Sequence, residues 1–182
     1  MTETPEDTSW ESEGWLVFEL LLAWTEAIVR QKTRLELARS RLSRPSRARS
    51  AEELRIEGHE KRFASRSYDT ECHLFVDAAW QLFEHRKRIR TLGIVSNDAF
   101  RELDNFERDV TGLKDGAIEY LTGGGHHPDS WIRQAEDGLS DPHAAAHTEL
   151  VGALDYVAFA ETAERLSRKL YEIDPNSPES TA

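Results

Sequence analysis

Residues 15–24 read Trp-Leu-Val-Phe-Glu-Leu-Leu-Leu-Ala-Trp, the longest apolar run in the chain, interrupted by Glu19. Extended on both sides, this run predicts a helix from about Trp10 to Leu42. One face of that helix is apolar at spacings of three, four or seven residues, namely at Val17, Leu21, Trp24, Ile28, Leu35, Ala38 and Leu42. Further apolar side chains fall on other faces, at Leu16, Phe18, Leu20 and Leu22. This pattern is typical of a helix that is buried on several sides or lies in an oligomer interface.

A second long helix is predicted from Ala51 to about Leu92. The Arg/Ser-rich linker 43–50 separates it from the first helix, because proline at position 45 cannot continue a helix. Ser50 followed by Glu53 is the pattern of a capping box. The helix is polar and charged to about residue 70 and strongly apolar after it, and Gly93 is a natural stop.

Two more helices follow from the same periodicity. Asn97 or Ser96 is expected to cap a third helix with an apolar face at Phe100, Leu103, Phe106, Val110, Leu113 and Ala117. Gly112 and Gly116 in its second half indicate close approach of another backbone, or a helix that ends early. Asp155 is expected to cap the last helix, whose stripe is Phe159, Ala163, Leu166 and Leu170, and Pro175 stops it.

The expected architecture is an all-α bundle of about four to five helices. We divide the chain into an acidic tail (1–9), a single helical domain (10–174) and a polar tail (175–182). Residues 126–154 stay open between a helix, which Asp141 followed by proline favours, and a short β-hairpin.

Composition limits the class of protein. The single cysteine, Cys72, excludes an internal disulfide and fits a reducing cytoplasm. The first nine residues are acidic, where a secretory signal needs positive charge. The ten-residue apolar run is half of the roughly 20 residues that a membrane-spanning helix requires. The sequence therefore predicts a cytoplasmic protein without a membrane segment.

Charge is distributed unevenly along a chain whose net charge is −11. Residues 1–29 carry seven acids and no base, whereas residues 30–49 carry eight bases and one acid. Five arginines of this basic segment are candidates for binding an acidic partner or nucleic acid: Arg39, Arg41, Arg44, Arg47 and Arg49. The alternative is a solvated linker. No aromatic residue is interleaved to stack bases, and the acidic remainder repels phosphates, so nucleic acid is not the expected partner.

Residues 108–125 read Arg-Asp-Val-Thr-Gly-Leu-Lys-Asp-Gly-Ala-Ile-Glu-Tyr-Leu-Thr-Gly-Gly-Gly. This segment resembles one in HEPN-like helical proteins, including a mainly actinobacterial group, whose pattern runs roughly Arg-Asp-x-Arg-Asn-x-x-Glu-His-x-Asp-Glu-Tyr-x-x-Gly-x-Gly. The matching positions are Arg108, Asp109, Glu119, Tyr120, Gly123 and Gly125. The resemblance covers roughly His73 to Leu170 and implies a HEPN-like bundle. It also implies short strands at Thr148–Val151 and Ala153–Leu154, with Gly152 in the turn between them.

The resemblance also locates the positions that carry catalysis in HEPN ribonucleases, an arginine and a histidine four to six residues later, usually from two facing protomers. Here those positions read Thr111 and Gly116. Neither supplies the cation and the proton-transfer group that general acid–base and electrostatic catalysis need. Three polar residues remain nearby and could form a different site: Lys114, Asp115 and Glu119. We therefore expect a degenerate motif and assign no catalytic residue.

Histidines are the weak candidates for a metal site. His126 and His127 are adjacent, and His143 and His147 are four apart, which would share a face if they lay on a helix. No glutamate stands at the position that makes a His-Glu-x-x-His motif specific, so exposed loop histidines are the alternative. We expect neither a metal nor a cofactor.

Aromatic residues on the first helix exceed what one helix face needs for packing. Protein interfaces are enriched in Trp and Phe. We therefore expect a homodimer interface that includes Trp15, Phe18, Leu21 and Trp24, with core packing as the alternative.

Two functional hypotheses follow. The first is a non-catalytic helical binding or scaffold protein related to HEPN-like domains, dimeric and able to bind a protein partner. The second is a HEPN-type RNA-directed enzyme, a ribonuclease whose active site is displaced or completed by a partner.

Overall fold

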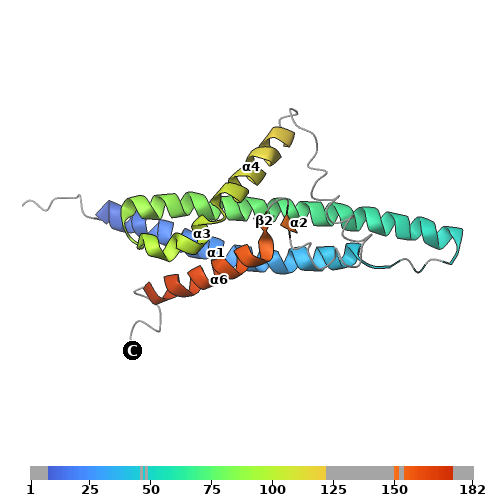
Figure 1. Cartoon of the computed structure of the whole chain (residues 1–182), viewed down its shortest axis with the longest axis horizontal. Helices are drawn as coiled ribbons and strands as arrows, with labels where there is room; N and C mark the ends of the chain where they lie inside the picture. The colour runs from blue at the N-terminus through green and yellow to red at the C-terminus, as the bar shows by residue number, and fades with distance from the viewer. Residues whose placement is uncertain (1–7, 46, 48, 122–149, 152–153, 174–182) are drawn as a thin grey trace, which may run out of the picture.

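The computed structural model describes residues 8–45, 47, 49–121, 150–151 and 154–173. Its elements follow in chain order: α1 (Thr8–Leu42), α2 (Ala51–Leu92), the 3-10 helix η1 (Asn97–Phe100), α3 (Arg101–Asp104), α4 (Glu107–Leu121), β1 (Leu150–Val151), β2 (Leu154–Asp155) and α6 (Tyr156–Ile173). Figure 1 shows α1 and α2 as a long antiparallel pair that α6 packs against, while α4 leaves the bundle at a steep angle. The expectation of an all-α bundle is confirmed.

The predicted helix ends of the α1–α2 pair are confirmed. Ser50 Oγ accepts a hydrogen bond from the Glu53 amide at 3.2 Å, and Glu53 Oε2 accepts one from the Ser50 amide at 2.9 Å. Two amides that have no partner inside the helix are thereby satisfied. Gly93 ends α2 in the left-handed region, at a φ of 68°, which glycine adopts without steric cost.

The third predicted helix is broken, so the expectation of one continuous helix from residue 97 was wrong. After η1 and α3, the chain turns at Asn105 and Phe106 before α4 begins. Two long-range contacts fix this break. The Asp104 carboxylate pairs with arginines of α2, and the Phe106 ring packs edge-on against Phe159 of α6 at a centroid distance of 5.3 Å.

The described residues meet neither expectation for Gly112 and Gly116. A Cβ added at either position would meet no atom within 4 Å, so neither glycine marks a close backbone approach within the described part of the chain. The helix does not end early either, because α4 continues to Leu121.

A short hairpin precedes the last helix, as the sequence resemblance implied. β1 and β2 are antiparallel, with Leu150 opposite Asp155 and Val151 opposite Leu154. Asp155 then caps α6, since its Oδ1 accepts a hydrogen bond from the Ala158 amide at 2.9 Å. Residues 126–149 and 152–153, the rest of the segment in which helix and hairpin were alternatives, lie outside the described residues, and so does the turn expected at Gly152.

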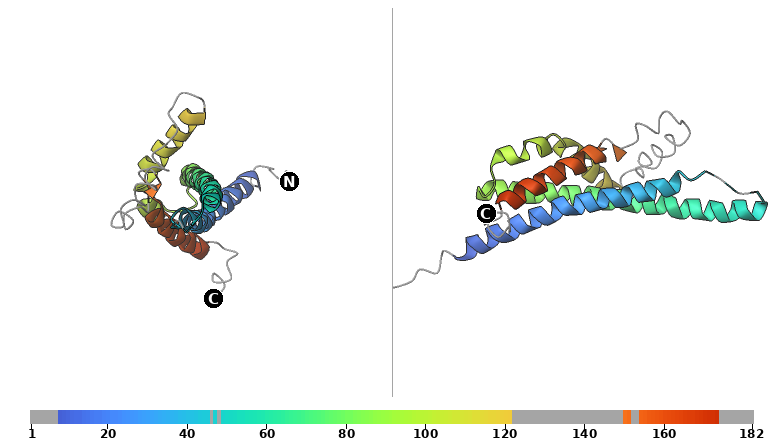
Figure 2. Two further views of the ribbon diagram at one scale, coloured as in Figure 1. Left: turned by 90° about the vertical axis from the view of Figure 1, so that its right-hand side faces the viewer. Right: turned by 90° about the horizontal axis from the view of Figure 1, so that it is seen from below.

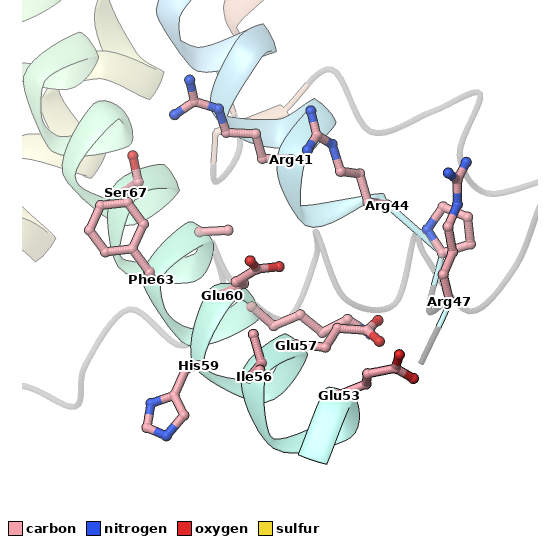
Figure 3. A pocket seen from close by; sticks show the side chains of 13 residues that line it. Arg41, Arg44, Arg47, Glu53, Ile56, Glu57, His59, Glu60, Phe63 and Ser67 are labelled. Carbon is pink, nitrogen blue, oxygen red and sulfur yellow. The ribbon is translucent and has the colours of Figure 1, made fainter. Parts of the chain in front are cut away.

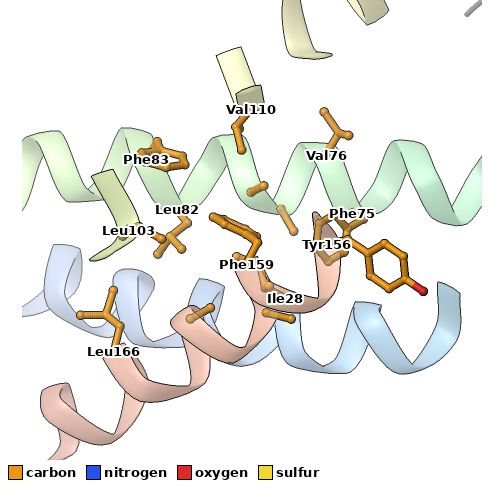
Figure 4. Close-up of a cluster of buried hydrophobic side chains, with 14 of the residues drawn as sticks. Ile28, Phe75, Val76, Leu82, Phe83, Leu103, Val110, Tyr156, Phe159 and Leu166 are labelled. Atoms are coloured by element: carbon orange, nitrogen blue, oxygen red, sulfur yellow. The ribbon is translucent and has the colours of Figure 1, made fainter. Parts of the chain in front are cut away.

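Aromatic packing around α6 forms the centre of the core (Figure 4). The Phe159 ring is fully buried and lies 5.3–6.1 Å, centroid to centroid, from Phe75, Phe83 and Phe106. Three elements therefore meet on one side chain: α2, the turn before α4, and α6.

Candidate functional site

The motif segment on α4 does not form a cluster of catalytic groups in the described residues. Thr111 is half-buried, and Gly116 is exposed with open space around it. Lys114 donates to the Asp77 carboxylate of α2, with Nζ and Oδ1 2.6 Å apart, so its charge is already paired. Asp115 is exposed. The side chain of Glu119 lies outside the described residues.

The candidate metal ligands are four histidines that follow α4 in the sequence. His126, His127, His143 and His147 all lie outside the described residues. Within the described ranges, no group of three or more His, Cys, Asp or Glu side chains is arranged to hold a metal ion.

The basic segment lines an open groove between the end of α1 and the first half of α2, with a volume of about 930 Å³ (Figure 3). Arg41, Arg44 and Arg47 come from the α1 side of the groove. The α2 side presents glutamates at positions 53, 57 and 60. Of the other two candidates, Arg49 is exposed and Arg39 is partly buried on α1. The arginines therefore do not form a uniformly positive surface, and a phosphate entering the groove would also meet carboxylates.

The expected interface residues of α1 divide into two groups. Phe18 is 3% exposed and Leu21 is fully buried, both inside the core of one chain, which removes them from a surface that a second copy could reach. Their expected interface role was wrong, because the side of α1 that carries them faces the neighbouring helices. Trp24 is half-buried with its ring 6.3 Å from the His85 ring. Trp15 is 39% exposed and stacks on Phe18 with centroids 5.9 Å apart.

Two other residues of the apolar run 15–24 face solvent. Leu16 is 57% exposed and Leu20 is 36% exposed, although both belong to the apolar run that the sequence singled out. Periodicity did not identify them as surface residues, because nearly every face of this helix is apolar and only the positions of α2 and α6 decide which face is covered.

A buried ion-pair cluster on α2 had no signal in the sequence. Arg86 is 2% exposed and pairs with Asp104 and with Glu107, in the second case with Nη2 and Oε2 2.7 Å apart. Arg90 reaches the other oxygen of Asp104 at 2.6 Å. The Arg86 guanidinium also lies 4.6 Å from the Phe83 ring centroid. Because the cluster joins α2 to both sides of the turn at residues 105–106, it positions α4.

The buried thiol of Cys72 is not an activated nucleophile. Burial raises its pKa to about 12, and burial also raises the pKa of the neighbouring Tyr68 hydroxyl. A thiol must lose its proton to act as a nucleophile, so Cys72 stays in its inert form at neutral pH.

Searches of family models, curated proteins and solved structures found no match to this chain. In the described part of the chain, no helix is both long enough and apolar enough to span a bilayer.

Proposed function

We propose that this protein is a non-catalytic helical binding or scaffold protein that acts as a homodimer and is related to HEPN-like domains. The observation that carries the proposal is the exposed apolar surface of α1, at Trp15, Leu16 and Leu20. Single exposed apolar residues are ordinary, but a group of them on one helix end is typical of an interaction site.

The surroundings of the motif on α4 support the non-catalytic part of the proposal. Of the two positions that match the HEPN catalytic pair, one is a half-buried threonine and the other an exposed glycine. Lys114, the cation that lies between these two positions in the sequence, is engaged by Asp77. A cation held by a carboxylate gives less stabilisation to a developing phosphate charge than a free one.

The composition of the groove supports a protein partner rather than a nucleic acid. Its arginines share the groove with glutamates and with the exposed apolar residues Ile56 and Phe63. Mixed charge and apolar surface complement a protein, whereas nucleic-acid binding depends on neutralising many phosphates.

A cleavage assay on mixed RNA, with and without divalent metal, separates this proposal from the HEPN-type ribonuclease. A general acid–base pair contributes about 10²–10⁴-fold to a rate, so wild-type protein is expected to cleave at background level. Lys114→Ala and Glu119→Ala are expected to leave that background unchanged. Robust cleavage that either substitution abolishes would mean that the site was rebuilt around these residues. The ribonuclease hypothesis would then replace the proposal of a non-catalytic protein.

A further inference from the structure

A second stripe on α1 runs along an exposed side of the helix and ends at Arg41, which also lines the groove between α1 and α2. Figure 2 shows α1 at the edge of the molecule, away from α4. The stripe has the spacing of a heptad repeat, alternately four and three residues, and consists of Leu16, Leu20, Ala23, Ala27, Arg30, Arg34, Leu37 and Arg41. Every member is exposed except Ala27, which is half-buried. At about 1.5 Å per residue the stripe is roughly 38 Å long.

Charge changes sign along this stripe. Its first half is apolar, and the charged residues on that half of the helix are acids, including the partly exposed Glu19 and Glu26. Its second half carries three exposed arginines around Leu37. The stripe therefore has an apolar, acid-flanked end and a basic end.

We propose that two copies of this chain pair along this stripe with their α1 helices antiparallel. The inference rests on the proposed dimer and specifies its surface and orientation. The spacing fits such a pair. In an antiparallel coiled coil, heptad position a of one helix packs against heptad position d of the other. In the register that places Leu20 opposite Leu37 of the second copy, Leu16 meets Arg41 and Ala23 meets Arg34.

Charge complementarity selects this orientation. Antiparallel pairing brings each basic end against the acid-flanked end of the other copy, so that Arg41 lies beside Glu19. Glu26 adds negative charge to that end, although its carboxylate already pairs with Arg30 and accepts from the Tyr171 hydroxyl of α6. The long arginine stems can cover the leucine and alanine side chains while their guanidinium groups reach the carboxylates. Parallel pairing would instead set Arg30, Arg34 and Arg41 against their own copies, and like charges facing each other are repulsive.

Disulfide trapping tests the orientation directly. Leu20→Cys and Leu37→Cys proteins are oxidised separately and as an equal mixture, with wild type reporting any background from the buried Cys72. In the antiparallel pair, the two copies of position 20 are about 25 Å apart, from 17 residues at ~1.5 Å each, too far for a disulfide. We expect a covalent dimer in the mixture and none with either variant alone.

The other outcomes overturn the inference in distinguishable ways. Covalent dimers of Leu20→Cys alone would show parallel pairing. No trapping in any sample, with wild-type protein dimeric by sedimentation, would place the dimer on another surface. The first result leaves the proposed function standing, and the second keeps the homodimer but removes the α1 surface that supports it. A monomer by sedimentation would overturn the dimer as well.

A charge-swap mixture provides a second, independent readout. Arg41→Glu and Glu19→Arg should each weaken self-association by about tenfold or more, because each sets like charges together. Mixing the two variants should restore association, since the heterodimer then contains an opposite-charge pair at both contacts. A mixture that associates no better than its components would contradict antiparallel pairing.

Discussion

The two halves of α2 are one continuous helix with opposite surroundings. Residues 72–92 lie inside the bundle, where Phe75, Leu82 and Phe83 are buried against α1 and α6. Residues 51–63 extend past the other helices, and Phe63 is 72% exposed. The second half is stabilised by packing, whereas the first half depends on its cap and on the end of α1. A helix assignment alone therefore does not say where the free energy of folding lies.

The largest effect is expected at the centre of the bundle. Phe159→Ala removes the α6 ring that contacts α2 and the turn before α4, and should lower the free energy of unfolding by about 3–5 kcal/mol. Urea denaturation measures this change. Phe63→Ala, the same substitution in the exposed half of α2, is the matched control and should stay within about 0.5 kcal/mol. Equal effects would remove the distinction between the two halves.

The free energy of unfolding is expected to depend on both carboxylates that pair with the buried Arg86. Asp104→Ala combined with Glu107→Ala leaves the Arg86 cation buried without either carboxylate, and should cost about 3–5 kcal/mol. Adding Arg86→Met should recover much of that loss, because it removes the buried charge at similar volume. The exposed pair on α6 is the control, and Glu164→Ala there should change stability by about 0.5 kcal/mol or less. If Arg86→Met fails to recover stability, the loss in the double variant does not come from the unpaired buried charge alone.

A smaller, local effect is expected at the start of α2. Ser50→Ala removes the side chain that accepts from the Glu53 amide and should cost about 1 kcal/mol. Hydrogen exchange of the amides in residues 51–57 measures this loss of stability at the start of α2. Faster exchange confined to this segment is expected, with unchanged protection in residues 72–92.

The same cap should depend on pH. Hydrogen bonds from the backbone amides of Arg49 and Ser50 hold the pKa of Glu53 below its ordinary value of 4.5. The carboxylate therefore contributes stability above that value and loses it as pH falls through the lowered pKa. Exchange in residues 51–57 should differ between wild type and Glu53→Gln at neutral pH, and the difference should vanish in acid. A difference that persists in acid would show that charge is not its source.

The elements that local chemistry controls were the ones that the sequence could predict. The capping box at Ser50, the stop at Gly93 and the cap at Asp155 each depend on residues a few positions apart, and all three are confirmed. The break at residues 105–106 depends on Arg86 and Phe159, which are distant in sequence, so periodicity continued the helix through it. No local pattern marks Arg86 as buried, because isolated arginines are usually exposed.

The candidate site was predictable in position but not in detail. The sequence identified α1 as a helix with too much apolar surface for one buried face. It assigned Phe18 and Leu21 to an interface, although these residues pack into the core of the same chain and Leu16 and Leu20 face solvent. Because nearly every face of this helix is apolar, its sequence does not show which apolar side chains are buried until the positions of α2 and α6 are known.

The open face of α1 is the surface that we propose joins two copies of this chain. Sedimentation equilibrium of wild-type protein beside Leu20→Glu tests it most directly, because the substitution places a charge on an exposed position and leaves the core intact. We expect wild type to approach twice the 20.8 kDa chain mass as concentration rises, and Leu20→Glu to remain near the chain mass. A wild-type monomer at every concentration, or a dimer that Leu20→Glu does not weaken, would contradict the claim.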